Sequence, residues 1–103
     1  MSYQTQSTVL GAPKLKEPKM YAVIMHNDDV TTMDFVVEVL QKVFNKSPHE
    51  SAVIMMSVHR GGKGVAGVYT YDLAVTKKRQ ADLMSRQRRF PLKLTVEEAS
   101  VGS

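Results

Sequence analysis

The chain has 103 residues, a formal net charge of +4 and no cysteine. This length suits one small domain that buries enough surface to fold without cross-links. The lack of cysteine excludes disulfides and thiolate zinc sites and fits a reducing compartment. No apolar run approaches the roughly 20 residues that cross a bilayer. Because segment 1–19 also lacks a signal-peptide core, we expect a cytoplasmic protein with no membrane partner.

The charge is unevenly distributed along the chain. Acidic residues gather in segment 28–38, whereas basic residues gather in segments 77–79 and 86–89. Basic runs of this kind occur in nucleic-acid-binding domains, so a small basic nucleic-acid-binding domain is the alternative function. The runs show no interleaved aromatic pattern and no nucleic-acid motif. We therefore favour a solvated helix face and expect no nucleic-acid partner.

Composition divides the chain into a core and two ends. Residues 1–18 are polar, contain proline and show no hydrophobic period, which predicts a flexible, disordered N-terminal extension. Such an arm is either inert or contacts a partner. Residues 19–98 are expected to form one core domain, and residues 99–103 to be frayed.

The first strand and the first helix are marked by a change of pattern. Residues 20–25 are almost continuously apolar, which is typical of a central strand buried on both faces. Asn27 to Asp29 end this strand, and Thr31 or Thr32 can then cap a helix with Asp34 near its positive start. Apolar residues follow at helical spacing, at Val36, Val39, Leu40, Val43 and Phe44.

A second helix begins with a strong local signal. Ser47 and Glu50 can form a capping box, and Pro48 suits the first turn. We expect this helix to run to about Val58. Its predicted apolar stripe contains Ala52, Met55, Met56 and, at its end, His59. Glycines in segment 61–64 then predict a loop, which lacks the spacing of a phosphate-binding loop.

The remaining chain predicts a strand, a helix and a last strand. Residues 65–69 form the strand, in which Gly67 allows close backbone approach. Thr70 can cap a helix from about residue 71 to 88, with a stripe at Leu73, Lys77, Ala81 and Met84 in which the lysine carries its charge outward. Residues 92–97 alternate as in a half-exposed strand. The expected fold is therefore α+β: a single small domain with the order β-α-α-β-α-β and a three-stranded sheet packed on three helices.

The polar residues with possible chemistry are Asn27, Asp28, Asp29 and His59. A catalytic histidine oriented by a carboxylate would serve a nucleophile, but no serine or cysteine stands in a recognisable setting. A metal site would combine His26 or His59 with the two aspartates, but adjacent carboxylates often point apart. We therefore favour neither a catalytic site nor a metal site. The simplest alternative is that the polar run is only a turn and a helix cap.

Apolar residues accompany this polar loop. Met33, Val36, Met55 and Val58 lie near the ends of the two helices. Each could be a core residue, although methionine also adapts to varied apolar ligands. An apolar hollow rimmed by an amide, carboxylates and a histidine suits an ammonium attached to an apolar side chain. The loop therefore predicts a cation site, above all for a peptide α-ammonium.

One set of residues recurs in order over most of the chain, from Pro18 to about Glu98. Its members are Asn27-Asp28-Asp29, Thr31, Met33, Phe35-Val36-Val37, Val39-Leu40, Phe44, Met55, Val58-His59, Gly67-Val68-Tyr69-Thr70, Ala74, Thr76-Lys77 and Pro91-Leu92. In these positions the chain resembles the ClpS family of adaptors, which deliver N-degron substrates to a Clp ATPase-protease. It departs from common members at four positions: Val30 and Thr32 replace an aromatic residue and a proline, Asp34 stands where glutamate is frequent, and Val75 replaces a frequent acidic residue.

The resemblance implies a role for each matching position. Residues that would bind the α-ammonium of the first substrate residue are Asn27, Asp28 and His59. Those that would hold the adjoining substrate backbone are Asp29 and Thr31. Those that would line a pocket for a first side chain, typically Phe, Tyr, Trp or Leu, are Met33, Val36, Met55, Val58 and Leu92.

The resemblance also implies a partner. Asp72, Thr76 and Lys77 would dock on the N-terminal domain of a ClpA-type AAA+ ATPase, which passes substrates to ClpP. The expected state is a monomer without catalysis or cofactor. Two other classes stay open at this point: a hydrolase that uses His59, and a ribosomal-stalk-like domain with a purely structural interface.

Overall fold

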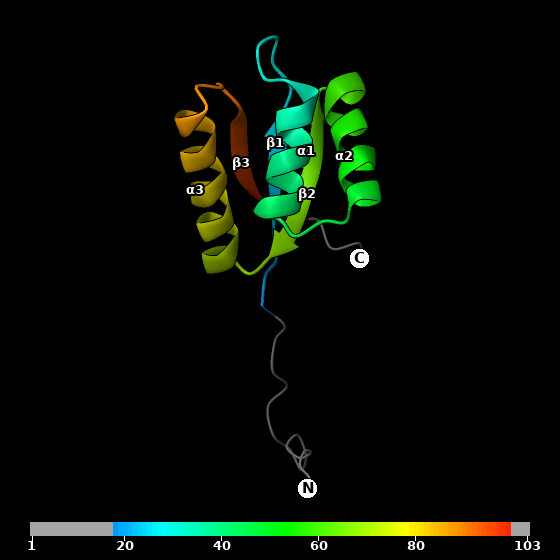
Figure 1. Cartoon of the computed structure of the whole chain (residues 1–103). Helices are drawn as coiled ribbons and strands as arrows, with labels where there is room; N and C mark the ends of the chain where they lie inside the picture. Colours follow the sequence, from blue (N-terminus) through cyan, green and yellow to red (C-terminus); the bar gives the residue numbers. More distant parts are fainter. Residues whose placement is uncertain (1–17, 100–103) are drawn as a thin grey trace, which may run out of the picture.

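The computed structural model describes residues 18–99. The predicted N-terminal extension, apart from Pro18, and residues 100–103 of the predicted frayed end lie outside the described residues. The predicted order of elements is confirmed (Figure 1). The elements are β1 (Tyr21–His26), α1 (Met33–Lys42), α2 (Pro48–Gly61), β2 (Lys63–Tyr69), α3 (Tyr71–Gln87) and β3 (Lys93–Glu98).

The three strands form one antiparallel sheet in the order β2-β1-β3. The central strand is β1, whose four middle residues are buried, as its continuous apolar sequence predicted. The sheet pairing extends to Ala99, whose N–H donates to the carbonyl oxygen of Met20 at 2.8 Å. Within residues 18–99, no helix is both long and apolar enough to cross a membrane.

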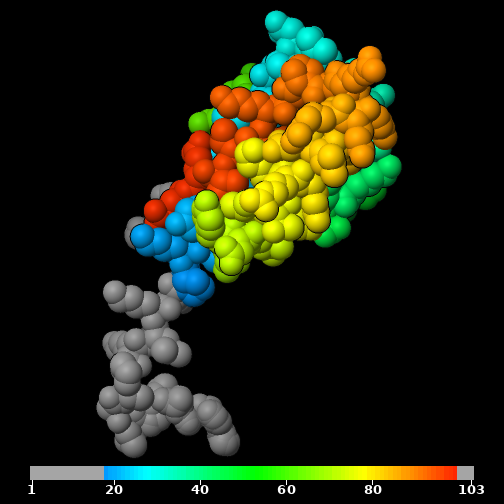
Figure 2. All heavy atoms as spheres, turned by 90° about the vertical axis from the view of Figure 1, so that its left-hand side faces the viewer, coloured from blue at the N-terminus to red at the C-terminus, as the bar shows by residue number. Residues whose placement is uncertain are grey.

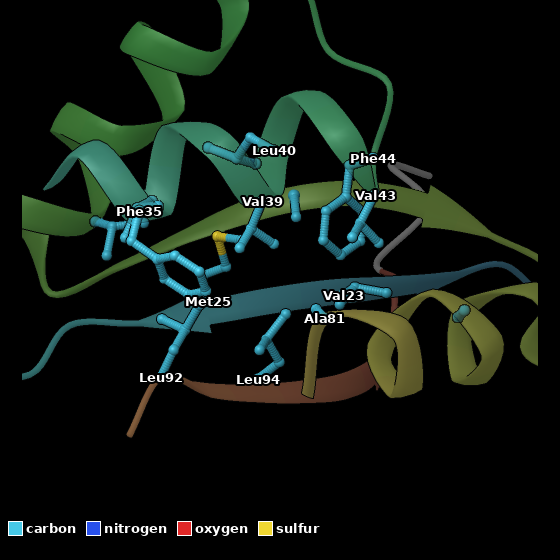
Figure 3. Packing of buried hydrophobic residues seen from close by; sticks show 14 residues of the cluster. Val23, Met25, Phe35, Val39, Leu40, Val43, Phe44, Ala81, Leu92 and Leu94 are labelled. Carbon is cyan, nitrogen blue, oxygen red and sulfur yellow. The ribbon is translucent and has the colours of Figure 1, made fainter. Parts of the chain in front are cut away.

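The hydrophobic core lies between the helices and the sheet. Figure 3 shows α1 above the sheet, with side chains of both layers meeting between them. All five positions of the apolar face predicted for the first helix are buried, although Val43 and Phe44 lie just past the end of α1: Val36, Val39, Leu40, Val43 and Phe44. This packing fixes α1 on the sheet and so fixes the loop that precedes it.

Two of the three predicted helix caps are made by side chains. The Oγ1 of Thr32 accepts the N–H of Phe35 at 3.1 Å. Ser47 and Glu50 form the predicted reciprocal capping box. Thr70 occupies the N-cap position of α3, but its side chain makes no cap hydrogen bond.

The glycine-rich loop predicted for residues 61–64 is wrong. Helix α2 continues to Gly61, and β2 already begins at Lys63. Gly62 alone turns the chain, in the left-handed conformation with φ 91°, and its N–H donates to the carbonyl oxygen of Val58 at 3.0 Å. Glycine adopts this conformation without strain, so one residue is enough for a helix end and a reversal.

The close backbone approach predicted at Gly67 is replaced by a side-chain contact. The ring of Tyr69 occupies the space that a side chain at position 67 would need. The neighbouring pairing of β1 with β2 is irregular, because its register shifts between Val23 and Ile24.

The apolar stripes predicted for α2 and α3 are partly wrong. In α3, Ala81 is buried as predicted, but Leu73 is 44% exposed and Ala74 is buried instead. Ala52 in α2 is exposed. The residues of α2 that pack toward the core are Ser51, Ile54, Met55 and Val58. Small and hydroxylated residues face the core here, so a pattern that weighs only large apolar residues misses them.

Ser51 offers a test of this packing. Its side chain is fully buried, and its Oγ has no hydrogen-bond partner among the described residues. An unpaired buried hydroxyl is destabilising, and alanine is a better helix former. We expect Ser51→Ala to raise the free energy of unfolding by about 1 kcal/mol, measured by urea denaturation. A loss of stability would contradict the assignment of an unpaired hydroxyl. Ser57→Ala in the same helix is the contrasting variant and should bring no such gain, because the hydroxyl of Ser57 donates to the carbonyl oxygen of Lys63.

Candidate functional site

A cavity of about 490 Å³ lies where the loop after β1 meets the start of α1 and the end of α2. Polar groups come from the loop and from His59, and apolar groups come mainly from the two helices. The lining residues are Asn27, Asp28, Asp29, Val30, Thr31, Thr32, Met33, Val36, Met55, Val58 and His59. Nine of these eleven were predicted as site residues from the sequence.

One backbone hydrogen bond joins the two sides of this cavity. The N–H of Asn27 donates to the carbonyl oxygen of Gly62 at 2.9 Å. The bond continues the antiparallel pairing of β1 with β2 one step beyond His26 and Lys63. It holds the polar loop against the end of α2, and therefore beside His59.

Asp28 organises the loop. Its Oδ1 accepts the N–H of Val30 at 2.8 Å and the N–H of Thr31 at 2.6 Å, and its Oδ2 accepts the hydroxyl of Thr31 at 2.7 Å. Burial alone would raise the pKa of the Asp28 carboxyl, but the hydrogen bonds from Thr31 and Val30 outweigh it and hold the pKa below its ordinary value. The cavity therefore contains a fixed negative charge.

The other polar residues of the cavity are accessible. Asn27, Asp29 and His59 are exposed, and Thr31 is half-buried. The hydroxyl proton of Thr31 is used by Asp28, so its oxygen is left as an acceptor. The predicted polar set is therefore brought together at one rim.

The apolar residues of the cavity form a floor, made by Val36 and Val58, and a wall, made by Met33 and Met55. Val36 and Val58 are 5% and 3% exposed and close the cavity from below. Met33 is 46% exposed at the opening, and Met55 is half-buried. A floor of branched side chains with flexible methionines around it suits an apolar side chain that enters from solvent.

Leu92 does not line the cavity, contrary to the expectation from the family resemblance. It is 6% exposed and belongs to the hydrophobic core. Figure 3 shows it on the side of Met25 away from α1. It directly precedes β3, which pairs with the opposite edge of β1 from β2.

Val30 and Thr32 line the cavity but were not among the predicted site residues. Val30 is 61% exposed, and Thr32 also caps α1. Their position between predicted site residues was the available signal, since a short loop brings all of its members to one rim.

His26, one of the histidines considered as a metal ligand, has a partner on the sheet. Its Nε2 lies 2.8 Å from the hydroxyl of Thr95 on β3. Among residues 18–99, no three His, Cys, Asp or Glu side chains come together as a potential metal site.

The predicted docking residues lie on α3, the face seen in Figure 2. Asp72 and Thr76 are exposed, and the hydroxyl of Thr76 donates to the carbonyl oxygen of Asp72 at 2.9 Å. The prediction that Lys77 carries its charge into solvent is wrong, because its Nζ donates to the carbonyl oxygen of Val43 at 2.7 Å. A lysine satisfies a free carbonyl at the end of a helix well, so it ties α3 to α1.

Several cations of the basic segments have partners within the domain. Lys78 pairs with Asp82 at 2.6 Å, and the guanidinium of Arg88 pairs with Glu38. Hydrogen bonds from Lys42 and then from Arg88 lower the pKa of the Glu38 carboxyl. Each of the two basic segments, 77–79 and 86–89, thus has one cation that is paired with an acidic side chain.

The comparison with known families then decides the relationship. A sequence model described as "ATP-dependent Clp protease adaptor protein ClpS" matches residues 16–95. This chain belongs to the ClpS family.

The alignments with similar ClpS proteins cover most of this chain. The ClpS adapter protein of Acetivibrio thermocellus is 55% identical over 82 residues, which cover 80% of this chain and 83% of that protein. The one from Syntrophus aciditrophicus is 52% identical over 85 residues, covering 82% of this chain and 79% of that protein. The resemblance seen in the sequence is therefore confirmed at the level of the family.

The fold agrees as well. A solved structure of Agrobacterium tumefaciens ClpS2 bound to L-phenylalaninamide is 38% identical to this chain, with a TM-score of 0.77. The match covers 81% of this chain and 100% of that chain.

The loop around Asp28 generates a prediction about stability and pH. A carboxyl whose pKa is lowered in the folded state stabilises it above its unfolded value, about 3.9, and this contribution is lost as the pH falls through the folded value. We expect Asp28→Asn to be less stable than the parent chain at neutral pH, and the difference to shrink toward about pH 2. The measurement is urea unfolding across this range. Asp29→Asn is the control, since Asp29 accepts none of these bonds; an equal effect in both variants would contradict the role of the Asp28 bonds.

Proposed function

We propose that this chain is an adaptor that binds the free N-terminal residue of substrate proteins. The preferred first residues are bulky and hydrophobic: Phe, Tyr, Trp or Leu. The observation that carries the proposal is one cavity in which the fixed charge of Asp28 lies at the rim and the apolar pair Val36 and Val58 forms the floor. A charged amine joined to an apolar side chain is complementary to both parts.

The α-ammonium would be held by acceptors at the rim. An ionised carboxylate offers about four acceptor positions, and three of those on Asp28 are used within the loop. The remaining position, the side-chain oxygen of Asn27 and a neutral nitrogen of His59 can each accept one N–H. Charge-assisted hydrogen bonds of this kind contribute roughly 1.5–3 kcal/mol each.

The first side chain would be buried in the apolar part of the cavity. Burial of a Phe or Leu side chain contributes about 1.5–3 kcal/mol. Together with the ammonium contacts, and after the cost of association, this corresponds to micromolar or tighter binding. Asp29 and Thr31, which line the same cavity, would contact the substrate backbone that follows.

The ligand of the similar protein supports the same class of substrate. Agrobacterium tumefaciens ClpS2 was solved with L-phenylalaninamide. That molecule has a free α-amine, an aromatic side chain and an uncharged amide where a peptide chain would continue. It therefore combines the two features to which the cavity of this chain is complementary.

Membership of the ClpS family supports delivery to a Clp ATPase as the second half of the proposal. We place the docking surface for the N-terminal domain of a ClpA-type ATPase at the start of α3, with Asp72 and Thr76 exposed there. Lys77 would contribute through the position of α3, because its ammonium is engaged with Val43. The adaptor would act as a monomer and pass its substrate to ClpP.

The first test is fluorescence anisotropy with labelled peptides that differ only at the first residue. We expect peptides beginning with Phe or Leu to bind at micromolar or lower concentration, because both the ammonium and the side chain are recognised. Peptides beginning with Val or with acetyl-Phe should bind at least about tenfold more weakly. Equal binding of Phe and acetyl-Phe peptides would contradict ammonium recognition. Binding of duplex DNA with steep salt dependence, and of no peptide, would favour the nucleic-acid alternative.

His59 gives the second test. We expect His59→Ala to weaken binding of the Phe peptide by about tenfold in titration calorimetry, because one acceptor of the ammonium is lost. His49→Ala, on the exposed start of α2, is the matched control. Unchanged affinity of His59→Ala for the Phe peptide would remove His59 from the site.

A further inference from the structure

Gly64 in β2 lies directly behind the floor of the cavity. It is buried and pairs with Met25 of the central strand. A Cβ atom at this position would stand 3.0 Å from Cγ2 of Val58 and 3.2 Å from the carbonyl oxygen of Ile54. Both separations are shorter than an ordinary van der Waals contact, so α2 rests on a strand position that has no side chain.

Val58 stands between this glycine and the cavity. Its side chain is 3% exposed and lines the cavity. Any atom added at position 64 would therefore press on the floor from below. The added atom could be accommodated if α2 moved away from the sheet or if the Val58 side chain moved into the cavity.

The end of α2 is held against such a movement. The N–H of Gly62 donates to the carbonyl oxygen of Val58 at 3.0 Å, and the carbonyl oxygen of Gly62 accepts the N–H of Asn27 at 2.9 Å. The hydroxyl of Ser57 also donates to the carbonyl oxygen of Lys63 at 3.3 Å. These bonds fix the last turn of the helix to β2 and to the polar loop, so displacement of the Val58 side chain is the easier response.

We propose that Gly64 is a positioning residue that sets the depth of the cavity through Val58 and so admits the largest aromatic first residues. This inference rests on the proposed function, since it concerns the substrate range of the same cavity. Tightly packed interiors respond to a single added methyl group, usually at a cost equivalent to about tenfold or more in an equilibrium. A shallower floor excludes an indole ring before it excludes a leucine side chain.

The test compares peptides that begin with Trp and with Leu and are otherwise identical. We expect Gly64→Ala to weaken binding of the Trp peptide by about tenfold and that of the Leu peptide by less than about twofold. The ratio of the two affinities is the readout, because partial unfolding would lower both equally. Gly61→Ala is the matched control, since a Cβ there meets no atom within 4 Å.

A second variant tests the route of the effect. In the Val58→Ala background the contact with Cγ2 of Val58 is absent, so Gly64→Ala can no longer act on the cavity through that side chain and should not change the Trp-to-Leu ratio. The same comparison serves if Gly64→Ala alone does not fold.

The outcomes separate this inference from the proposed function. An unchanged ratio in Gly64→Ala, or a ratio change that persists in the Val58→Ala background, would overturn the role of Gly64 while leaving N-terminal recognition intact. Failure of the parent chain to bind either peptide would overturn the proposed function and this inference with it.

Discussion

The site depends on the hydrogen bond between the N–H of Asn27 and the carbonyl oxygen of Gly62. It joins the end of β1 to the turn after α2, and so brings two distant parts of the chain to the same cavity. The turn itself is possible because Gly62 adopts a left-handed conformation. Without that reversal, β2 could not pair with β1 directly after the helix, and His59 would not lie beside Asp28.

The negative charge and the apolar floor of the cavity are held in place by different parts of the structure. The negative charge is fixed within the loop, where Asp28 accepts three hydrogen bonds from Val30 and Thr31. The apolar floor is fixed by the core, because Val36 and Val58 belong to the same buried cluster as the central strand. The cavity is therefore formed before a ligand arrives, which reduces the ordering cost of binding.

Local sequence signals predicted the order of elements, the central strand, the face of α1 and the start of α2. Contacts between elements were harder to predict. Leu92 was assigned to the pocket by resemblance, but it belongs to the core cluster. The helix stripe predicted that Lys77 carries its charge outward, but the carbonyl oxygen of Val43 at the end of α1 accepts its ammonium. The stripe of α3 was misread because Ala74, although small, is the residue that packs closely. These features depend on distances between elements, which a linear pattern does not contain.

The exposed Val30 at the rim has a consequence for how such a site can vary. Its N–H holds the loop through Asp28, while its side chain is 61% exposed and lines the opening. The backbone N–H of Val30 thus stabilises the loop, and its side chain takes no part in that hydrogen bond. Exchange of this side chain can reshape the entrance without dismantling the loop, so substrate preference can diverge between paralogous adaptors while the fold stays the same.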